Sequence, residues 1–523
     1  MTEYQLGKWN LSELAKNPKS PAFQKQVQEL EKQAKRFEKI KSNLSPQMSS
    51  KKFMDILQQV EEISEKMSKV GGYASLSYAS DTQSDEATSL VTKISKLGSE
   101  ISNKILFFDL WWKIQVDEKN AKRLMKDAGE LIEYLSHKRL FAKYALSEPE
   151  EKIINTLDVT GISALVKLYD KITNAYEYKM KLGNKTKIMT REELTNYVRS
   201  TNPKIRETAY KTMLSKYTQN KGVTGEIYQN IVLNWRDEGI EIRGYKSPIG
   251  MRNIGNDVDD KTIESLLAVC RKNSPVFQKF FSQKAKMLKM KKLRRYDIYA
   301  PATANIKEKN YTYNKSVKLV FESLGKFSST LEEFARKVFN ENHIDSSIRP
   351  GKRDGAFCST LTPKITPFVL VNFTGKSRDV FTLAHELGHA VHSQAAQDRS
   401  ILVQDAPLPL AETASTFSEL LLYDNLSDKI SDNEKKVMLS EKIDDLYATI
   451  LRQSFFTIFE VDAHKQIGNG TTVDELSKTY LQNLKEQFGN SVDISDDFAI
   501  EWSCIPHFYH TPFYCYAYSF GNL

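Results

Sequence analysis

The sequence predicts a mainly α-helical protein with one small β-sheet. Through most of the first 240 positions, apolar residues recur at three-and-four spacing with charged residues between them. Turn-forming residues stand where this pattern breaks. A single stretch, ITPFVLVNF at 365–373, has the β-branched and aromatic composition that is typical of a strand.

The helical segments expected first along the chain are amphipathic. They cover 20–41, 50–70, 84–112, 118–145, 148–179 and 203–240. The pattern breaks at 42–46 and at Gly183-Asn184, where turn residues gather. Thr190 is followed three residues later by Glu193, a capping-box pattern that predicts a helix start.

The sequence changes character after a turn-rich stretch at 243–248. Helices are expected at 259–292, with a start at Ser274-Pro275, and at 313–340. The predicted strand at 365–373 follows, and the helical pattern returns from Ser377. We therefore expect two parts, an N-terminal helical lobe over 1–185 and a larger domain over 186–523.

The composition, 40% hydrophobic and 27% charged, is that of a globular protein. A net charge of +9 over 523 residues is mild, and no nucleic-acid motif accompanies it. The densest basic run, KAKMLKMKKLRR at 284–295, is interpreted as a solvated helix face, with Met287, Leu288 and Leu293 as core positions. We expect no nucleic-acid partner.

Membrane insertion and disulfide bonding are also not expected. The longest apolar run, 105–112, is too short to span a bilayer, and positions 1–17 lack the apolar core of a secretory signal. The four cysteines show no CxxC spacing. These features predict a cytoplasmic location in a reducing compartment.

The chemistry is carried by His385-Glu386-Leu387-Gly388-His389, an HExxH motif. On a helix, residues four apart share a face, so both imidazoles can reach one metal ion. Glu386 then lies beside the metal without binding it, where a general base for a metal-activated water belongs. The motif sits in an apolar helix, which argues against a chance match.

A catalytic zinc needs a third protein ligand. A third histidine six residues after the second is excluded, because Ala395 stands there. The alternative is a glutamate from the helix expected after Pro407 and Pro409. Glu412 and Glu419 are seven apart and share a face, so one would bind the metal and the other would orient a ligand.

Two other features have competing interpretations. His392 either supports the metal ligands or lies on the helix surface. The segment HFYHTPFYCYAY at 507–518 is either an aromatic packing element or a set of donors that stabilises the oxyanion of a tetrahedral intermediate.

Taken together, these motifs resemble the thimet oligopeptidase/oligoendopeptidase F metallopeptidases, and the oligoendopeptidase F branch most closely. The resemblance runs in order from about position 190 to 523. It is carried by RGYKSP at 243–248, GKRDGAFC at 351–358, FTLAHELGHAVH at 381–392, ETAS at 412–415 and PHFY at 506–509.

The resemblance implies an elongated, multi-helix zincin-type fold, with the small sheet beside the active-site helix and a deep channel that admits unfolded peptides. It implies one zinc ion per chain, with ligands His385, His389 and Glu412 and with Glu386 as catalytic base. It also implies that His507 and Tyr516, near the C-terminus, donate hydrogen bonds to the scissile carbonyl. Tyr509, His510 and Tyr514 are nearby candidates for the same role. The segment 368–373 resembles the edge strand that pairs with the substrate.

The function predicted from the sequence is therefore that of a zinc endopeptidase acting on short peptides. Members of the resembling family usually continue for several tens of residues past the tyrosine-rich segment, so the chain is expected to be short at its C-terminus. Two alternatives stay open: a metallo-carboxypeptidase, for which no carboxylate clamp is identified, and a metal-binding but inactive peptide-binding protein. The oligomeric state is not predicted.

Overall fold

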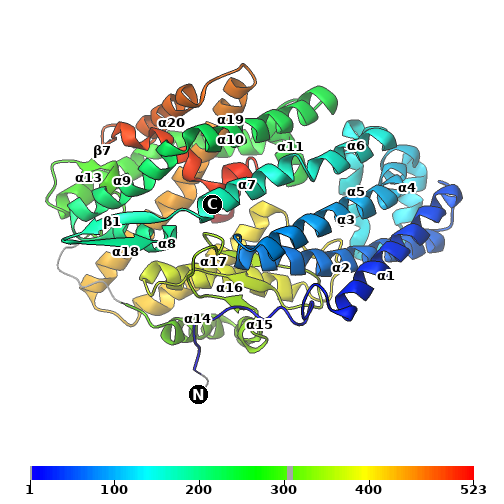
Figure 1. Cartoon of the computed structure of the whole chain (residues 1–523), viewed down its shortest axis with the longest axis horizontal. Coiled ribbons are helices and arrows are strands. Elements are labelled where there is room, and N and C mark those ends of the chain that lie inside the picture. The colour runs from blue at the N-terminus through cyan, green and yellow to red at the C-terminus, as the bar shows by residue number, and fades with distance from the viewer. Residues whose placement is uncertain (1–2, 303–309) are drawn as a thin grey trace.

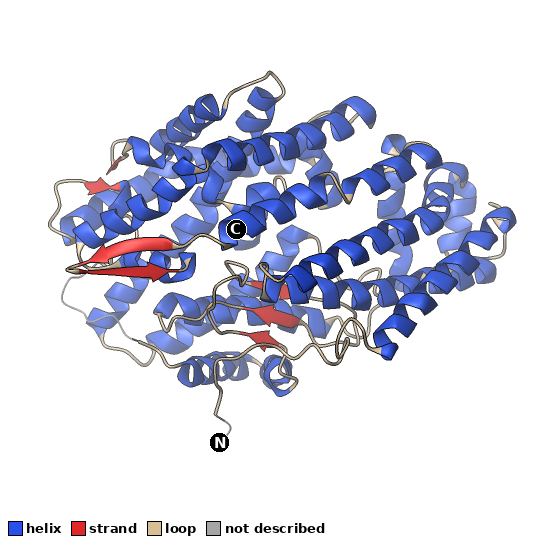
Figure 2. Cartoon of the chain, viewed as in Figure 1, coloured by secondary structure: helices blue, strands red, loops and turns tan. Residues whose placement is uncertain are grey.

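Helices dominate the computed structural model, which describes residues 3–302 and 310–523 (Figure 2). The molecule is elongated, and the first helices gather at one end of its long axis (Figure 1). The predicted fold class, mainly α with small sheets, is confirmed.

The N-terminal helices follow the predicted segments but are more often broken. They are α1 (Pro21–Glu38), α2 (Ser50–Ser80), α3 (Asp85–Leu110), α4 (Glu118–Met125), α5 (Ile132–Leu140), α6 (Glu148–Asp158) and α7 (Ile162–Asn174). α1 begins where the Ser20 side chain accepts the N–H of Phe23. The segments predicted at 118–145 and 148–179 are each divided by non-α-helical residues.

The break at Gly183-Asn184 is the turn of a β-hairpin that was not predicted from the sequence. β1 (Tyr178–Leu182) pairs antiparallel with β2 (Lys185–Met189). Gly183 has φ +61°, a left-handed conformation that a two-residue hairpin loop requires. The predicted start at Thr190 is confirmed, because its side chain caps α8 (Arg191–Thr195) in a reciprocal capping box with Glu193.

The middle of the chain is again helical, and its basic run is not simply a solvated face. The helices are α9 (Pro203–Gln219), α10 (Lys221–Arg236), α11 (Pro248–Gly255), α12 (Asp260–Lys272) and α13 (Ser274–Met287). Lys284 is fully buried and donates to Ile298 O at 2.7 Å as well as to Asp444. Arg295 is buried against Glu501, whereas Met287, a predicted core position, is 55% exposed. The prediction holds for Leu288 and Leu293, which pack in the core. It was wrong for Lys284 and Arg295, because buried carboxylates compensate their charges.

The remaining helices lie along both long sides of the molecule. They are α14 (Tyr313–Phe327), α15 (Ser329–Asn340), α16 (Ser377–Ala395), α17 (Leu408–Ser427), α18 (Asp432–Leu446), α19 (Arg452–Ile467), α20 (Val473–Phe488), α21 (Pro506–His510) and α22 (Tyr516–Asn522). In Figure 1, α14 to α18 lie along one long side, and α9, α10, α13, α19 and α20 lie along the opposite side.

The predicted strand at 365–373 is shorter than expected and is not an edge strand. β6 (Phe368–Leu370) lies between β4 (Ile344–Asp345), to which it is parallel, and β5 (Phe357–Ser359), to which it is antiparallel. β6 is fully buried, and both of its sides are already hydrogen-bonded. A peptide therefore cannot pair with it, and β5 is the sheet edge that packs against α16.

Three large hydrophobic cores support this arrangement. The first joins α9, α10, α19 and α20, and the third lies beneath α14, α16 and α17. The second packs the N-terminal helices against Leu361, Ile365, Phe368 and Leu370 of the sheet region. The N-terminal helices thus support the sheet beside α16, while the domain boundary near 185 stays a prediction.

Within the described ranges, no helix is both long enough and apolar enough to cross a membrane. All four cysteines, Cys270, Cys358, Cys504 and Cys515, are free thiols. This agrees with the expectation that disulfides do not hold the fold together.

Candidate metal centre

The HExxH residues lie on α16, whose start is fixed by a side chain. The Asp379 carboxylate accepts the N–H groups of Thr374 at 2.6 Å and Lys376 at 3.0 Å, which satisfies donors that a helix start leaves free. Leu383 and Leu387 are fully buried in the core. The helix is therefore held on its apolar side, and its histidines are left on another face.

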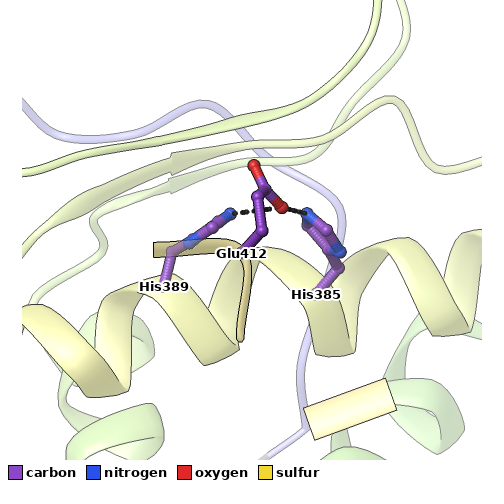
Figure 3. Close-up of side chains that lie close together, drawn as sticks. All are labelled: His385, His389 and Glu412. Carbon is purple, nitrogen blue, oxygen red and sulfur yellow. Dashed lines mark ion pairs between the residues drawn. The ribbon is translucent and has the colours of Figure 1, made fainter. Parts of the chain in front are cut away.

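His385, His389 and Glu412 converge on one point (Figure 3). The Glu412 Oε2 atom lies 3.4 Å from His385 Nε2 and 3.7 Å from His389 Nε2. The potential ligand atoms all lie within 4.8 Å of one another. Two imidazole nitrogens and one carboxylate oxygen are the donor set of a catalytic zinc site that keeps one coordination position open. The donor set present in this structure therefore fits zinc.

The absence of a side chain at Gly388 allows α17 to bring Glu412 this close. A Cβ atom built at Gly388 would stand 2.7 Å from Ala414 O, 2.7 Å from Ser418 Oγ and 2.8 Å from Ser415 Cα. No side chain fits at such distances. The two helices are thus in backbone contact directly behind the ligands.

Polar side chains around the three residues orient them. His385 Nδ1 lies 2.7 Å from Glu419 Oε1, and Lys442 Nζ lies 3.5 Å from the other oxygen of Glu419. The Glu412 carboxylate accepts from Tyr514 OH at 2.6 Å and from Ser415 Oγ at 3.0 Å. Such contacts fix the tautomer and direction of a metal ligand. Of the two candidates left open by the sequence, Glu412 meets both imidazoles and Glu419 orients one of them.

The protonation states of the triad are interdependent. Burial would lower the pKa of His385, but hydrogen bonds with Glu412 and Glu419 raise it well above its ordinary value. Burial would raise the pKa of Glu412, but the hydrogen bond from His385 lowers it to about 2. Burial lowers the pKa of His389 to about 4. Glu412 and His389 are thus in the protonation states that metal binding requires, whereas His385 must give up a proton.

Glu386 is buried beside the triad and has a free oxygen. Its side chain is 5% exposed, and Oε2 has no hydrogen-bond partner among the described residues. Burial raises the pKa of Glu386 to about 7, although the nearby His385 opposes the rise. A carboxyl group with a pKa near neutrality can both take and return a proton.

The structure divides the tail residues into two groups. His507 and Tyr514 lie together beside Glu412, with rings stacked at 5.3 Å, and His507 Nε2 is 3.1 Å from Tyr518 OH. The other candidates point elsewhere. Tyr516 OH accepts from Asn256 at 2.7 Å, Tyr509 OH donates to Thr224 O, and His510 bridges Asp170 and Arg353.

Tyr516 had been expected to face the metal, and Tyr514 stands against Glu412 instead. The reason is the path of the chain: Tyr516 begins α22, which packs along α17 and buries the Tyr516 ring beside Ile263 and Phe513. At the other end of α22, a Cβ atom on Gly521 would stand 2.8 Å from Glu412 Cβ. The C-terminal residues are therefore part of the wall behind this ligand.

Sequence reasoning missed three residues that complete the site. Lys442 comes from a polar helix, α18, without any motif, and Gly388 was not recognised as a contact point. Tyr518 was visible only as one tyrosine among several. His392 is half-buried. It lies close enough to His389 and Asp405 for its charge to affect the pKa of both groups.

A cavity of about 970 Å³ adjoins the site. It lies between the α8 region and the helices α16, α17 and α18, and its lining includes Phe381, one turn before His385, and Lys442. The ligands themselves do not line it. Glu419 does not line it either, and the cavity is linked to the site through Lys442, which contacts Glu419.

The fold and the site define a metallopeptidase. Residues 196–521 match the model of peptidase family M3, and residues 114–178 match a model described as oligopeptidase F. The first match spans more than half of the chain, so the chain belongs to peptidase family M3, a family of metallopeptidases.

Similar proteins cover nearly the whole chain. The oligoendopeptidase F homolog of Borreliella burgdorferi is 28% identical over 98% of this chain and 86% of its own length. The chromosomal oligoendopeptidase F of Lactococcus lactis subsp. cremoris is 28% identical, covering 95% of this chain and 84% of its own. Among solved structures, Pz peptidase A with an inhibitor shares the fold with a TM-score of 0.82, at 15% identity and coverage of 94% and 85%.

Proposed function

We propose that this chain is a zinc endopeptidase that hydrolyses internal bonds of short, unfolded peptides. The observation that carries the proposal is the convergence of His385, His389 and Glu412 beside a buried, unpartnered Glu386 oxygen. One zinc ion per chain is the expected cofactor. The relatives named oligoendopeptidase F support peptides as substrates.

Each residue of the site has a role in this chemistry. When bound to His385, His389 and Glu412, zinc supplies a Lewis acid that polarises the peptide carbonyl and makes a water nucleophilic at neutral pH. Glu386 accepts the proton of the attacking water and passes it to the nitrogen of the leaving amine. The positive charge of a bound metal ion would favour the carboxylate form of Glu386 at neutral pH.

The tail residues support the transition state. Burial lowers the pKa of His507 to about 4, so its imidazole is neutral at pH 7 and keeps one N–H donor. A fixed donor of this kind stabilises a developing oxyanion. Tyr514 holds the Glu412 carboxylate through its hydroxyl.

The substrate lies beside β5 in this proposal. β5 is an edge of its sheet and packs against α16, so an extended peptide that adds to it runs past the HExxH helix. Backbone pairing does not depend on the side chains of the peptide, so we expect broad specificity. The cavity next to Phe381 and Lys442 offers room for the part of the peptide beyond the scissile bond.

The test combines metal content with cleavage. The purified chain is assayed for zinc and incubated with an internally quenched peptide of about ten residues, blocked at both ends, with and without a chelator. We expect one zinc per chain and chelator-sensitive internal cleavage. Cleavage only of a peptide with a free C-terminus would favour the carboxypeptidase, and zinc with tight peptide binding but no cleavage would favour the inactive binding protein. We also propose a cytoplasmic location.

A further inference from the structure

The turn between α21 and α22 contains a residue in an unfavourable conformation. Phe513 has φ +57°, in the left-handed region that bulky side chains rarely occupy. Such a conformation persists only where surrounding contacts enforce it. The turn directly precedes Tyr514, the residue that reaches Glu412.

The contacts that enforce this turn come from α19 and α11. The Phe513 N–H donates to Glu460 Oε1 at 2.8 Å, and the Glu460 side chain is 1% exposed. One turn further along α19, the His464 ring packs 4.5 Å from the Phe513 ring. On the other side, Pro512 O accepts from Arg252 Nε at 2.9 Å. Within residues 3–302 and 310–523, Glu460 is the residue that hydrogen-bonds to Phe513 itself.

The turn sets the direction of the next side chain. From this backbone, Tyr514 OH reaches Glu412 Oε1 at 2.6 Å, while Glu412 Oε2 faces the two imidazoles. A relaxed Phe513 would rotate the following residue away from this line. Among the described residues, Glu460 itself hydrogen-bonds to backbone and not to the triad.

We propose that Glu460 is a positioning residue of the peptidase site: by accepting the Phe513 N–H it holds the left-handed turn and so fixes the Tyr514 hydroxyl on Glu412. The inference rests on the proposed function, because it takes Glu412 as a metal ligand. Glu460 acts through Tyr514 and touches neither metal nor substrate.

The chemistry of Glu460 indicates which substitutions preserve this role. Burial raises the pKa of Glu460 to about 8, so the group is largely protonated at neutral pH. Glu460→Gln keeps a neutral side chain of the same shape with an oxygen acceptor. Glu460→Met keeps the volume without the acceptor, and Glu460→Asp retracts the carboxyl by one methylene.

The first experiment measures the anchor without metal or substrate. Hydrogen–deuterium exchange is followed over residues 511–515 in the zinc-free proteins. We expect exchange to accelerate in Glu460→Met and Glu460→Asp and to stay at the wild-type rate in Glu460→Gln. Unchanged protection in Glu460→Met would overturn the proposal, because the hydrogen bond would then not hold the turn.

The second experiment links the anchor to Tyr514 by a double-mutant cycle at saturating zinc. Since misplacement near 1 Å can cost on the order of 10²-fold, we expect Glu460→Met to lower kcat by about 10- to 100-fold with a smaller change in KM. In a Tyr514→Phe background, the same substitution should have little further effect.

The outcomes separate this inference from the proposed function. A wild-type protein without chelator-sensitive cleavage contradicts the proposed function, while the exchange experiment still tests the anchor. A folded, zinc-loaded Glu460→Met with the wild-type kcat contradicts the positioning role, as does an equal loss in the Tyr514→Phe background. If Glu460→Met does not fold, Glu460→Asp provides the same comparison against Glu460→Gln.

Discussion

The close contact of α16 and α17 at Gly388 can be tested by adding one methyl group. In Gly388→Ala, the new Cβ would stand 2.7 Å from Ala414 O and Ser418 Oγ. Ordinary van der Waals contact begins at 3.4 Å, so the helices must separate by about 0.7 Å. That displacement moves Glu412 away from the two imidazoles.

The effect on folding and the effect on the metal differ in size. Overpacking costs about 1–3 kcal/mol, while alanine in place of a helical glycine returns about 1 kcal/mol, so the zinc-free protein loses at most about 2 kcal/mol. The gain in helix propensity does not offset the displacement of Glu412 from the two imidazoles. Disturbing the support of a metal ligand weakens binding by about 10–100-fold, and we expect at least the lower value here.

The assay is zinc affinity by competition with a chromophoric chelator, together with thermal unfolding of the zinc-free protein. The matched control is Gly71→Ala, also inside a helix, where the nearest atom to the added Cβ is Met67 Cε at 3.7 Å. We expect the control to bind zinc normally and to be slightly more stable. Wild-type zinc affinity and turnover in Gly388→Ala would refute the reasoning, because the helices would then have room to spare.

Four further predictions follow from the same geometry. Glu386→Gln should retain its zinc, measured by metal analysis, but lose about 10²–10⁴-fold in kcat; normal turnover in the zinc-loaded variant would exclude Glu386 as the base. Glu419→Gln should weaken zinc binding by about 10–100-fold in chelator competition, and an unchanged affinity would show that His385 needs no such partner. Because neighbouring carboxylates raise the pKa of His385, zinc must displace its proton, and below that pKa the zinc affinity should fall about tenfold per pH unit. The proton release should be visible by calorimetry in buffers of different ionisation enthalpy. A zinc affinity that does not depend on pH would contradict this. Lys284→Met should destabilise the fold by about 3–5 kcal/mol by leaving Asp444 buried and unpaired, less so when combined with Asp444→Asn, as measured by denaturant unfolding.

Helix positions were predictable from the sequence because their determinants are local. The capping box at Thr190 and the proline start at Ser274 lie within a few residues of the helices that they begin. The hairpin at 178–189 was missed, although Tyr178 and Met180 are buried and the lysine between them is exposed, which is the alternation of a strand. A three-residue strand such as β6 is too short to reveal which neighbours it pairs with.

The convergence of the candidate metal ligands was largely predictable and their surroundings were not. Spacing within one helix places His385 and His389 together, but Glu412 and Glu419 share a face of α17, so only the packing of α16 on α17 separates their roles. Tyr514 and Tyr516 stand two residues apart in the sequence. Which of them contacts Glu412 depends on the left-handed turn at Phe513, and no local sequence pattern predicts that turn.

The packing of α22 on α17 also bears on how the protein is made. Glu412 is synthesised well before Tyr514 and Gly521, which later lie against it; at about 5–20 residues per second the delay is roughly 5–20 s. During that interval the nascent chain holds the metal ligands without their supporting wall. We expect peptidase activity to appear only after this late segment has docked. An incomplete nascent chain would then cleave neither itself nor other nascent chains.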